Sequence, residues 1–244
     1  MTVYHIHKKT QAWYGESIGI LILDAAYPCI PGNIGNASTF PFPVRYEKVT
    51  GASIDRLLNQ QDPELAVPFI QAATRLQESG VHAITGACGF MALFQQEVAQ
   101  HVDIPVFLSS LLQIPFIHQI TNKKIGIITA SAACLQARHF TAVGVSQKLP
   151  LVIAGMENQA EFRDAVLKEK GSLDSAKIQK EVVAVAEEMT AAHPDIGSIL
   201  LECSDLPPYA HAVQSAVGLP VFDFFTMINY VHTVLVRKPF TGFM

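Results

Sequence analysis

Two stretches decide the fold: VHAITGACGFMALFQQEVAQHVDIPVF, residues 81–107, and IGSILLECSDLPPYAHAVQSAVGLPVF, residues 196–222. They align without a gap at a constant offset of 115 residues, which pairs Cys88 with Cys203 and the Pro-Val-Phe at 105–107 with the same tripeptide at 220–222. Strand propensity alone would explain shared valines and isoleucines. It does not require a cysteine at the same junction in both stretches, so the repeat indicates an internal duplication.

The rest of the chain extends this pattern in both directions. Helical patterns separate apolar runs that lack polar alternation, which predicts parallel strands covered on both faces. The expected strands lie at 17–23, 81–85, 105–108, 124–129, 149–154, 198–201 and 219–224, and the expected helices at 63–79, 91–102, 132–143 and 175–192.

The fold class predicted from this alternation is α/β. We expect two pseudo-symmetric Rossmann-like halves, with parallel sheets flanked by helices and the active site between them. The first half is expected at 1–118 and the second at 119–222, and a C-terminal helix within 223–244 is expected to pack back on the core. Exchange of that helix between the halves is left open.

The composition gives no indication of a nucleic-acid or membrane partner. The 244 residues carry 17 basic and 21 acidic side chains, a net charge of −4, without a basic stripe that would indicate a nucleic-acid surface. No apolar run approaches the roughly 18 residues of a membrane span. The four cysteines are dispersed without a CxxC pair, and export features are missing, which favours free thiols in a cytoplasmic protein.

Cys88 and Cys203 each follow a predicted strand and precede a helix. Ligands of open parallel sheets collect beyond the carboxyl ends of the strands. A helix N-terminus lowers the pKa of a thiol from its usual value of about 8.5, and its free N–H groups can hold a substrate carboxylate. One thiolate could remove an α-proton while the other thiol returns one to the opposite face, without a metal or an organic cofactor. The alternative is that both cysteines are small buried hydrophobic residues.

The chain resembles the Asp/Glu racemase superfamily of aspartate, glutamate and hydantoin racemases. The resemblance rests on ITGACG around Cys88, LLECSDLPPY around Cys203 and the two-half architecture, and it covers nearly the whole chain. It implies that the two cysteines are the acid/base residues. It also implies that backbone and hydroxyl groups near six residues hold a carboxylate: Thr85, Gly89, Phe90, Thr129, Ser131 and Ser204.

The residues beside the cysteines depart from the pattern of the amino-acid racemases. Gly89-Phe90 stands where those enzymes often have Asn-Thr, and Ser204-Asp205 stands where they often have Thr-His. Asp24-Ala25 replaces the acidic-Ser motif that usually ends their first strand. These departures leave the two-base chemistry intact, but they leave the identity of the substrate open.

The loop from 24 to 47, DAAYPCIPGNIGNASTFPFPVRYE, looks like the long first loop of one branch of the superfamily. Its Pro, Gly and Asn residues suit either a pocket wall at Asn33 and Asn36 or plain turn chemistry. Asp24, at the end of the first strand, could position a ligand amine or a water, or it could cap the loop.

The sequence therefore predicts a cofactor-independent racemase or epimerase that acts on a small carboxylate-bearing substrate, such as an amino acid. One alternative is a cis–trans isomerase of a dicarboxylate in which Cys88 is the nucleophile. The other is a non-catalytic small-molecule binding protein. No metal, nucleic acid or membrane partner is expected, and a homo-oligomer is left open.

Overall fold

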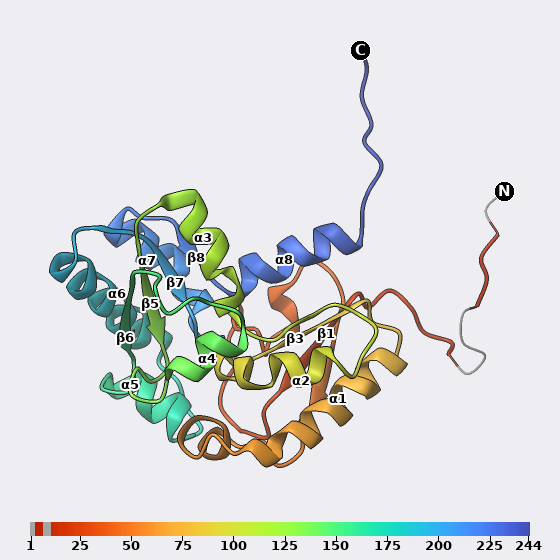
Figure 1. The fold of residues 1–244 in the computed structure, drawn as a ribbon, viewed down its shortest axis with the longest axis horizontal. Helices are drawn as coiled ribbons and strands as arrows, with labels where there is room; N and C mark the ends of the chain where they lie inside the picture. Colours follow the sequence, from red (N-terminus) through yellow and green to blue (C-terminus); the bar gives the residue numbers. More distant parts are fainter. Residues whose placement is uncertain (1–2, 7–10) are drawn as a thin grey trace.

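The protein, described here by a computed structural model of residues 3–6 and 11–244, contains two four-stranded sheets in which every paired strand is parallel. Their strand orders are β2-β1-β3-β4 and β6-β5-β7-β8, so the second sheet repeats the topology of the first. The two halves lie side by side with helices around them (Figure 1). The predicted fold class is confirmed.

The strands are β1 (Ile18–Ile22), β2 (Val44–Lys48), β3 (Ala83–Gly86), β4 (Val106–Phe107), β5 (Lys124–Thr129), β6 (Leu151–Gly155), β7 (Ile196–Leu201) and β8 (Val221–Phe222). The α-helices are α1 (Ala66–Glu78), α2 (Gln95–Ala99), α3 (Ile114–Thr121), α4 (Ala137–Ala142), α5 (Ala160–Phe162), α6 (Ser175–Ala192), α7 (Ala210–Val217) and α8 (Phe224–Leu235). Short 3₁₀ and π segments are η1 (Ala37–Thr39), η2 (Asp55–Asn59), η3 (Pro63–Leu65), η4 (Gly89–Phe94), η5 (Ser110–Gln113), η6 (Arg163–Leu167) and η7 (Pro207–Tyr209).

The first sheet is buried on both faces, which is why β1 reads as an unbroken apolar run. Leu21 of β1 belongs to the large core that contains α1 and α2, whereas Ile18 and Ile20 point to the opposite face. On that face they pack with Phe224 and Ile228 of α8.

Each half covers the sheet of the other with one helix. The helix α3 follows the first sheet in the chain but packs on β5 and β7 of the second. The helix α8 follows the second sheet but packs on the first, and Figure 1 shows the two helices over opposite halves. This reciprocal arrangement ties the halves together through their cores. The predicted boundary at 118 falls inside α3, and 1–118 also includes 1–2 and 7–10, which lie outside the described residues. The division into folding units stays a prediction.

Two local predictions were wrong. The strand β2 was missed because its sequence, VRYEK, is an only partly buried edge strand with polar residues. The helix expected from 132 begins only at Ala137. The backbone N–H groups of Ala132 and Ala133 donate to the Glu157 carboxylate, so this segment forms a turn, and Cys134 lies in that turn rather than in a helix.

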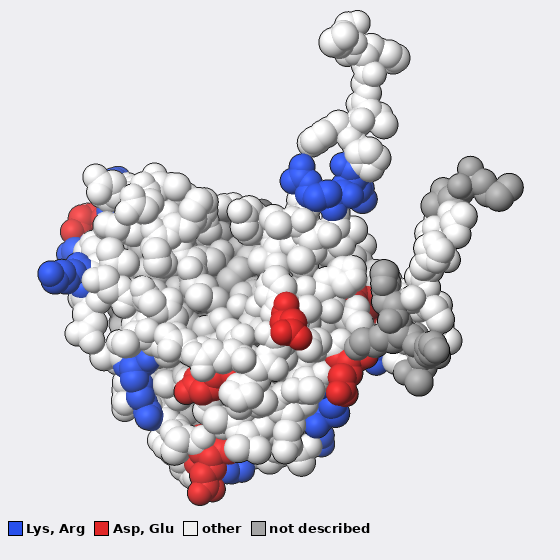
Figure 2. All heavy atoms as spheres, turned by 45° about the vertical axis from the view of Figure 1, so that its right-hand side comes forward, with Lys and Arg blue, Asp and Glu red and all other residues white. Residues whose placement is uncertain are grey.

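On the face shown in Figure 2, the charged side chains of the described residues are mixed in sign. Acidic and basic side chains are scattered over the face in Figure 2, with basic side chains close together only at the base of the C-terminal tail. Among the described residues, no helix combines the length and the apolar character needed to cross a membrane.

The packing of α8 on the first sheet predicts a stability effect. Ile228 is fully buried, so Ile228→Ala leaves a cavity and should reduce the free energy of unfolding by about 2–5 kcal/mol. Tyr230, on the same helix, is 73% exposed, and Tyr230→Ala should change it by less than about 0.5 kcal/mol. Urea denaturation followed by circular dichroism measures both, and equal effects would contradict this packing.

Candidate active site

The loops after β3 and β7 meet between the two halves. The Ser204 hydroxyl donates a hydrogen bond of 2.7 Å to the Ala87 carbonyl, which fixes the two cysteine-bearing loops against each other. A Cβ atom added at Gly89 would lie 2.6 Å from the Glu202 carbonyl oxygen, so only glycine allows this approach. The structure therefore brings Cys88 and Cys203 to one junction, as the repeat predicted.

The long loop after β1 closes this junction. Asn33 donates from Nδ2 to Oδ1 of Asp205 at 2.6 Å, and the Ile34 N–H donates to the Ser204 carbonyl at 3.2 Å. Gly32, with a φ of +99°, packs so closely on Pro208 that a Cβ would lie 2.8 Å from the Pro208 Cα. The predicted pocket wall at Asn33 is thus a structural partner of the second half.

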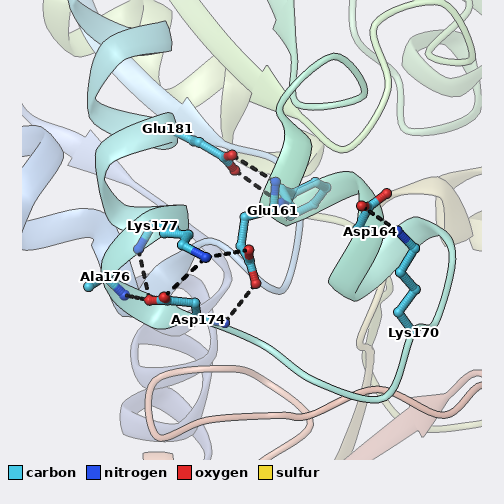
Figure 3. A network of polar contacts seen from close by, with 8 residues as sticks. Glu161, Asp164, Lys170, Asp174, Ala176, Lys177 and Glu181 are labelled. Atoms are coloured by element: carbon cyan, nitrogen blue, oxygen red, sulfur yellow. Dashed lines mark hydrogen bonds and ion pairs between the residues drawn. The ribbon is translucent and has the colours of Figure 1, made fainter.

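A polar network holds another part of the second half against the same loop. Figure 3 shows Glu161 between Lys177 and the Asp174 backbone, close to Glu181. This network ties α5 to the start of α6, where the Asp174 carboxylate caps the helix, and so holds both ends of the segment between the two helices. Glu169, in that segment, accepts a hydrogen bond of 2.6 Å from the Ala26 N–H. The backbone next to Tyr27 is therefore held from the second half.

The thiol of Cys88 lies at the N-cap of η4 and is partly exposed. Backbone N–H groups of Phe90 and Met91 lower its pKa, as the sequence predicted. Burial has the largest effect, however, and with the negative charge of Glu202 it raises the pKa well above the usual range. The predicted lowering of the thiol pKa is wrong, because desolvation outweighs a single short helix end.

Cys203 is buried, and its thiol donates to Oδ2 of Asp205 at 3.3 Å. Burial raises the pKa of Cys203, and the negative charge of Asp205 raises it further. The Asp205 carboxylate also accepts hydrogen bonds from Asn33 and Tyr27. These bonds lower the pKa of Asp205, but burial raises it by more.

Glu202 is the site residue that sequence reasoning missed. Its side chain is fully buried, Oε2 accepts a hydrogen bond of 2.8 Å from the Thr129 hydroxyl, and Oε1 has no hydrogen-bond partner among the described residues. A Cβ on Gly89 would lie 1.8 Å from that free oxygen. Burial raises the pKa of Glu202 to about 7. The sequence LLECSD could have indicated Glu202, because an acidic residue directly after a buried strand has to be paired or protonated.

Three of the predicted carboxylate-binding hydroxyls already donate their protons within the protein. Thr85 donates to the Phe107 carbonyl at 2.7 Å, Thr129 to Glu202, and Ser204 to the neighbouring loop as described above. Their hydroxyl protons are therefore engaged in this arrangement, and a part of these residues in carboxylate binding stays a prediction. Ser131 differs, because its oxygen accepts from the Cys134 N–H and no described residue accepts its own proton.

Asp24 and the Phe90 side chain lie away from the junction. Asp24 is exposed, forms an ion pair with Lys48 at 3.1 Å and accepts from the Gly51 N–H, which lower its pKa. It therefore caps its own loop. The Phe90 ring is buried and packs edge-on against His139, with ring centroids 5.0 Å apart. Phe90 contributes its backbone N–H to the site, and its ring does not line the cavity beside the junction.

A cavity of about 90 Å³ lies beside the junction. Its lining combines polar groups of the first loop with apolar side chains, namely Ile22, Leu23, Ala25, Tyr27, Cys29, Asn33, Gly35 and Ala87. A larger hollow of about 580 Å³ lies near Gln61, Phe94 and Arg138 and contains neither Cys88 nor Cys203. Ala87 precedes Cys88 in the chain, and Asn33 bonds to Asp205 beside Cys203. The smaller cavity therefore adjoins both cysteine loops.

A family model for Asp/Glu/hydantoin racemases matches residues 51–228, which include both cysteines and the whole second sheet. The chain belongs to this family. Its members named among the solved structures are enzymes, and so are its curated relatives. The predicted superfamily is confirmed, and this chain is an enzyme.

The curated relatives carry a different activity from the one predicted. A dimethylsulfoniopropionate lyase of Durusdinium sp. clade D is 33% identical over 234 residues, covering 93% of this chain and 77% of the relative. Dimethylsulfoniopropionate lyase 3 of Emiliania huxleyi is also 33% identical, covering 93% of this chain but 61% of its own longer sequence. These lyases overturn the prediction of a racemase or epimerase, together with its two alternatives.

Solved structures agree in fold. A variant of arylmalonate decarboxylase in a sulfate-associated form matches with a TM-score of 0.62 at 15% identity, covering 89% of this chain and 92% of the other. Allantoin racemase from Pseudomonas fluorescens matches with a TM-score of 0.59 at 14% identity, covering 90% and 91%. One fold thus carries racemases and a decarboxylase, so fold does not decide the reaction.

The buried Glu202 carboxyl predicts a pH dependence of stability. Its pKa is about 7 in the folded protein against 4.5 for the free side chain, so the folded state binds the extra proton. Stability is complete below about pH 4.5 and is lost as the pH rises through 7, by on the order of 3 kcal/mol. Glu202→Gln should remove this loss, and should be the more stable protein at pH 8.

Urea denaturation at pH 4.5, 6 and 8 tests this expectation. The exposed Glu188→Gln is the matched control, and its difference from wild type should stay constant over that range. A Glu202→Gln protein whose stability fell with pH as steeply as that of the wild type would contradict the assignment.

Proposed function

We propose that this chain is a lyase that cleaves dimethylsulfoniopropionate or a closely similar β-sulfonio carboxylate. The observation that carries the proposal is the 33% identity, over 93% of the chain, to enzymes that are named as dimethylsulfoniopropionate lyases. The two cysteine loops and their buried acids support it, because they supply groups that can remove a proton from carbon.

The proposed reaction is a β-elimination. A thiolate takes the proton on the carbon next to the carboxylate, and the electron pair of that C–H bond forms a carbon–carbon double bond. The bond from the β-carbon to sulfur breaks, and its electron pair leaves with sulfur. The products are acrylate and dimethyl sulfide, and the proton stays on the cysteine until it is released to solvent.

This reaction shares its first step with racemisation, which explains how one family can contain both. Both begin with removal of an α-proton beside a carboxylate. A racemase returns a proton to the opposite face and so needs two bases. A lyase needs only one, because the leaving group departs with the electrons.

Cys88 is the proposed base. It is partly exposed, and the N–H groups of Phe90 and Met91 stabilise its anion. Cys203 is buried and hydrogen-bonded to Asp205, which suits it to hold Asp205 and the substrate in place. For the carboxylate end, the Ser131 hydroxyl and backbone N–H groups remain as donors, since the other predicted hydroxyls are engaged.

Cysteine variants test the base. Cys88→Ser should lower kcat for release of dimethyl sulfide by about 10²–10⁴-fold, because a hydroxyl is a far weaker base than a thiolate. Cys134→Ser is the matched control: its thiol contacts Asn59 outside the junction, and the variant should keep wild-type activity. Headspace gas chromatography measures dimethyl sulfide, and circular dichroism confirms that the variants fold. Wild-type activity in Cys88→Ser would refute the assignment.

A second measurement separates lyase from racemase chemistry. In D₂O, a lyase should convert dimethylsulfoniopropionate to dimethyl sulfide and acrylate, which proton NMR detects. Incubation of glutamate, aspartate or hydantoin with the same enzyme should leave their α-protons unexchanged. Exchange of those protons without formation of acrylate would refute the proposed function.

A further inference from the structure

The junction gathers acidic groups without a basic one. Tyr27, Glu202 and Asp205 surround the thiols of Cys88 and Cys203, and every group of these five that ionises becomes negative. In each case burial raises the pKa, and where hydrogen bonds lower it, as for Cys88, Glu202 and Asp205, burial outweighs them. Across the described residues, no lysine, arginine or histidine side chain bonds to any of the five.

The basic groups of the surroundings are engaged or neutral. Lys48 pairs with Asp24 at the surface, and Arg138 donates to Gln61. The buried His139 lies behind the Phe90 ring, and burial lowers its pKa to about 4, so it carries no charge near neutrality. Cys29, on the first loop, is itself a partly buried thiol, and burial raises its pKa to about 11. The cluster has no internal counter-charge.

A site of this composition fits a cation better than a carboxylate. An aromatic ring attracts a ligand cation through its π face, and quaternary onium groups are the ligands typical of such sites. The neighbouring cavity has apolar walls from Ile22, Leu23 and Ala25 and a polar side from Tyr27 and Asn33. Methyl groups of an onium ion would contact the apolar walls while its charge faces Tyr27 and Asn33, which both hydrogen-bond to Asp205.

We infer that Tyr27 and Asp205 bind the onium end of the substrate, and that the arriving cation converts the Cys88 thiol into the thiolate that acts as base. This inference rests on the proposed function and adds the residues that recognise the substrate and the event that activates the base. An opposite charge nearby favours the ionised form of an acid, so the cation reverses the effect of Glu202 and Asp205. The proton leaves Cys88 for solvent.

Activation of the base by the substrate's own charge also makes the site specific for substrates that carry an onium group. A carboxylate of the same shape that lacks the onium group brings no positive charge, so both thiols stay protonated and no base forms. A substrate with an onium group creates the base by binding. The site therefore distinguishes the two at the chemical step as well as in affinity.

An isosteric pair of unreactive ligands tests the inference. Trimethylammonioacetate carries an onium group and a carboxylate, and 3,3-dimethylbutanoate has the same shape without the positive charge. Neither has a leaving group on a β-carbon. Isothermal titration calorimetry at pH 8, in two buffers of different ionisation enthalpy, measures the affinity of each and the number of protons released.

We expect the onium ligand to bind at least tenfold more tightly than 3,3-dimethylbutanoate and to release up to one proton, while 3,3-dimethylbutanoate releases none. Cys88→Ser should keep the preference but lose the proton release. Tyr27→Leu and Asp205→Asn should each reduce the preference by about tenfold, whereas Tyr27→Phe should retain most of it. Cys134→Ser serves again as the unchanged control.

Equal affinity for the two ligands would overturn the cation site, and proton release that persists in Cys88→Ser would overturn the activation of Cys88. The outcome is separable from that of the proposed function. Dimethyl sulfide release without an onium preference would refute this inference alone. An onium preference with proton release, but no dimethyl sulfide from any sulfonio carboxylate, would support the site and refute the lyase.

Discussion

The contact between the loops after β3 and β7 is the constraint on which the rest of the site depends. It consists of the hydrogen bond from Ser204 to the Ala87 carbonyl and of the close approach of Gly89 to Glu202. It requires the two halves to face each other in one orientation, and the exchanged helices α3 and α8 fix that orientation through the cores. The first loop then closes over the contact through Asn33.

Burial at this contact sets the chemistry. The enclosed groups include two thiols and two carboxyls, and their mutual repulsion and desolvation all act against ionisation. A buried group of this kind gains a charge only when another charge arrives. The same physics that keeps the thiols protonated makes them responsive to a cationic substrate. Reactivity is therefore coupled to occupancy rather than built into the resting protein.

The change from a predicted racemase to a proposed lyase leaves the geometry of proton removal unchanged. Two cysteines at duplicated positions indicate proton transfer, and that inference applies to both reactions. The step after proton removal depends on whether the substrate carries a leaving group, which no residue pattern in the chain states. The sequence identity to dimethylsulfoniopropionate lyases supplies that information. The acidic side chains at the junction, to which no described basic side chain bonds, agree with a substrate that carries a positive charge.

The sequence by itself determined the duplication, the two parallel sheets and the pairing of Cys88 with Cys203, because these follow from strand periodicity and from a repeat that can be read without coordinates. It also indicated Asn33 as part of the wall, but not its bond to Asp205. Only the tertiary structure decided that Asp24 lies outside the site, that the hydroxyls of Thr85 and Thr129 are already engaged, and that Glu202 lies inside. The reason is physical: which way a loop side chain points, and whether a charge is desolvated, depend on neighbours from the other half of the chain. The pKa values of the cysteines depend on that enclosure, so local sequence predicted the wrong direction.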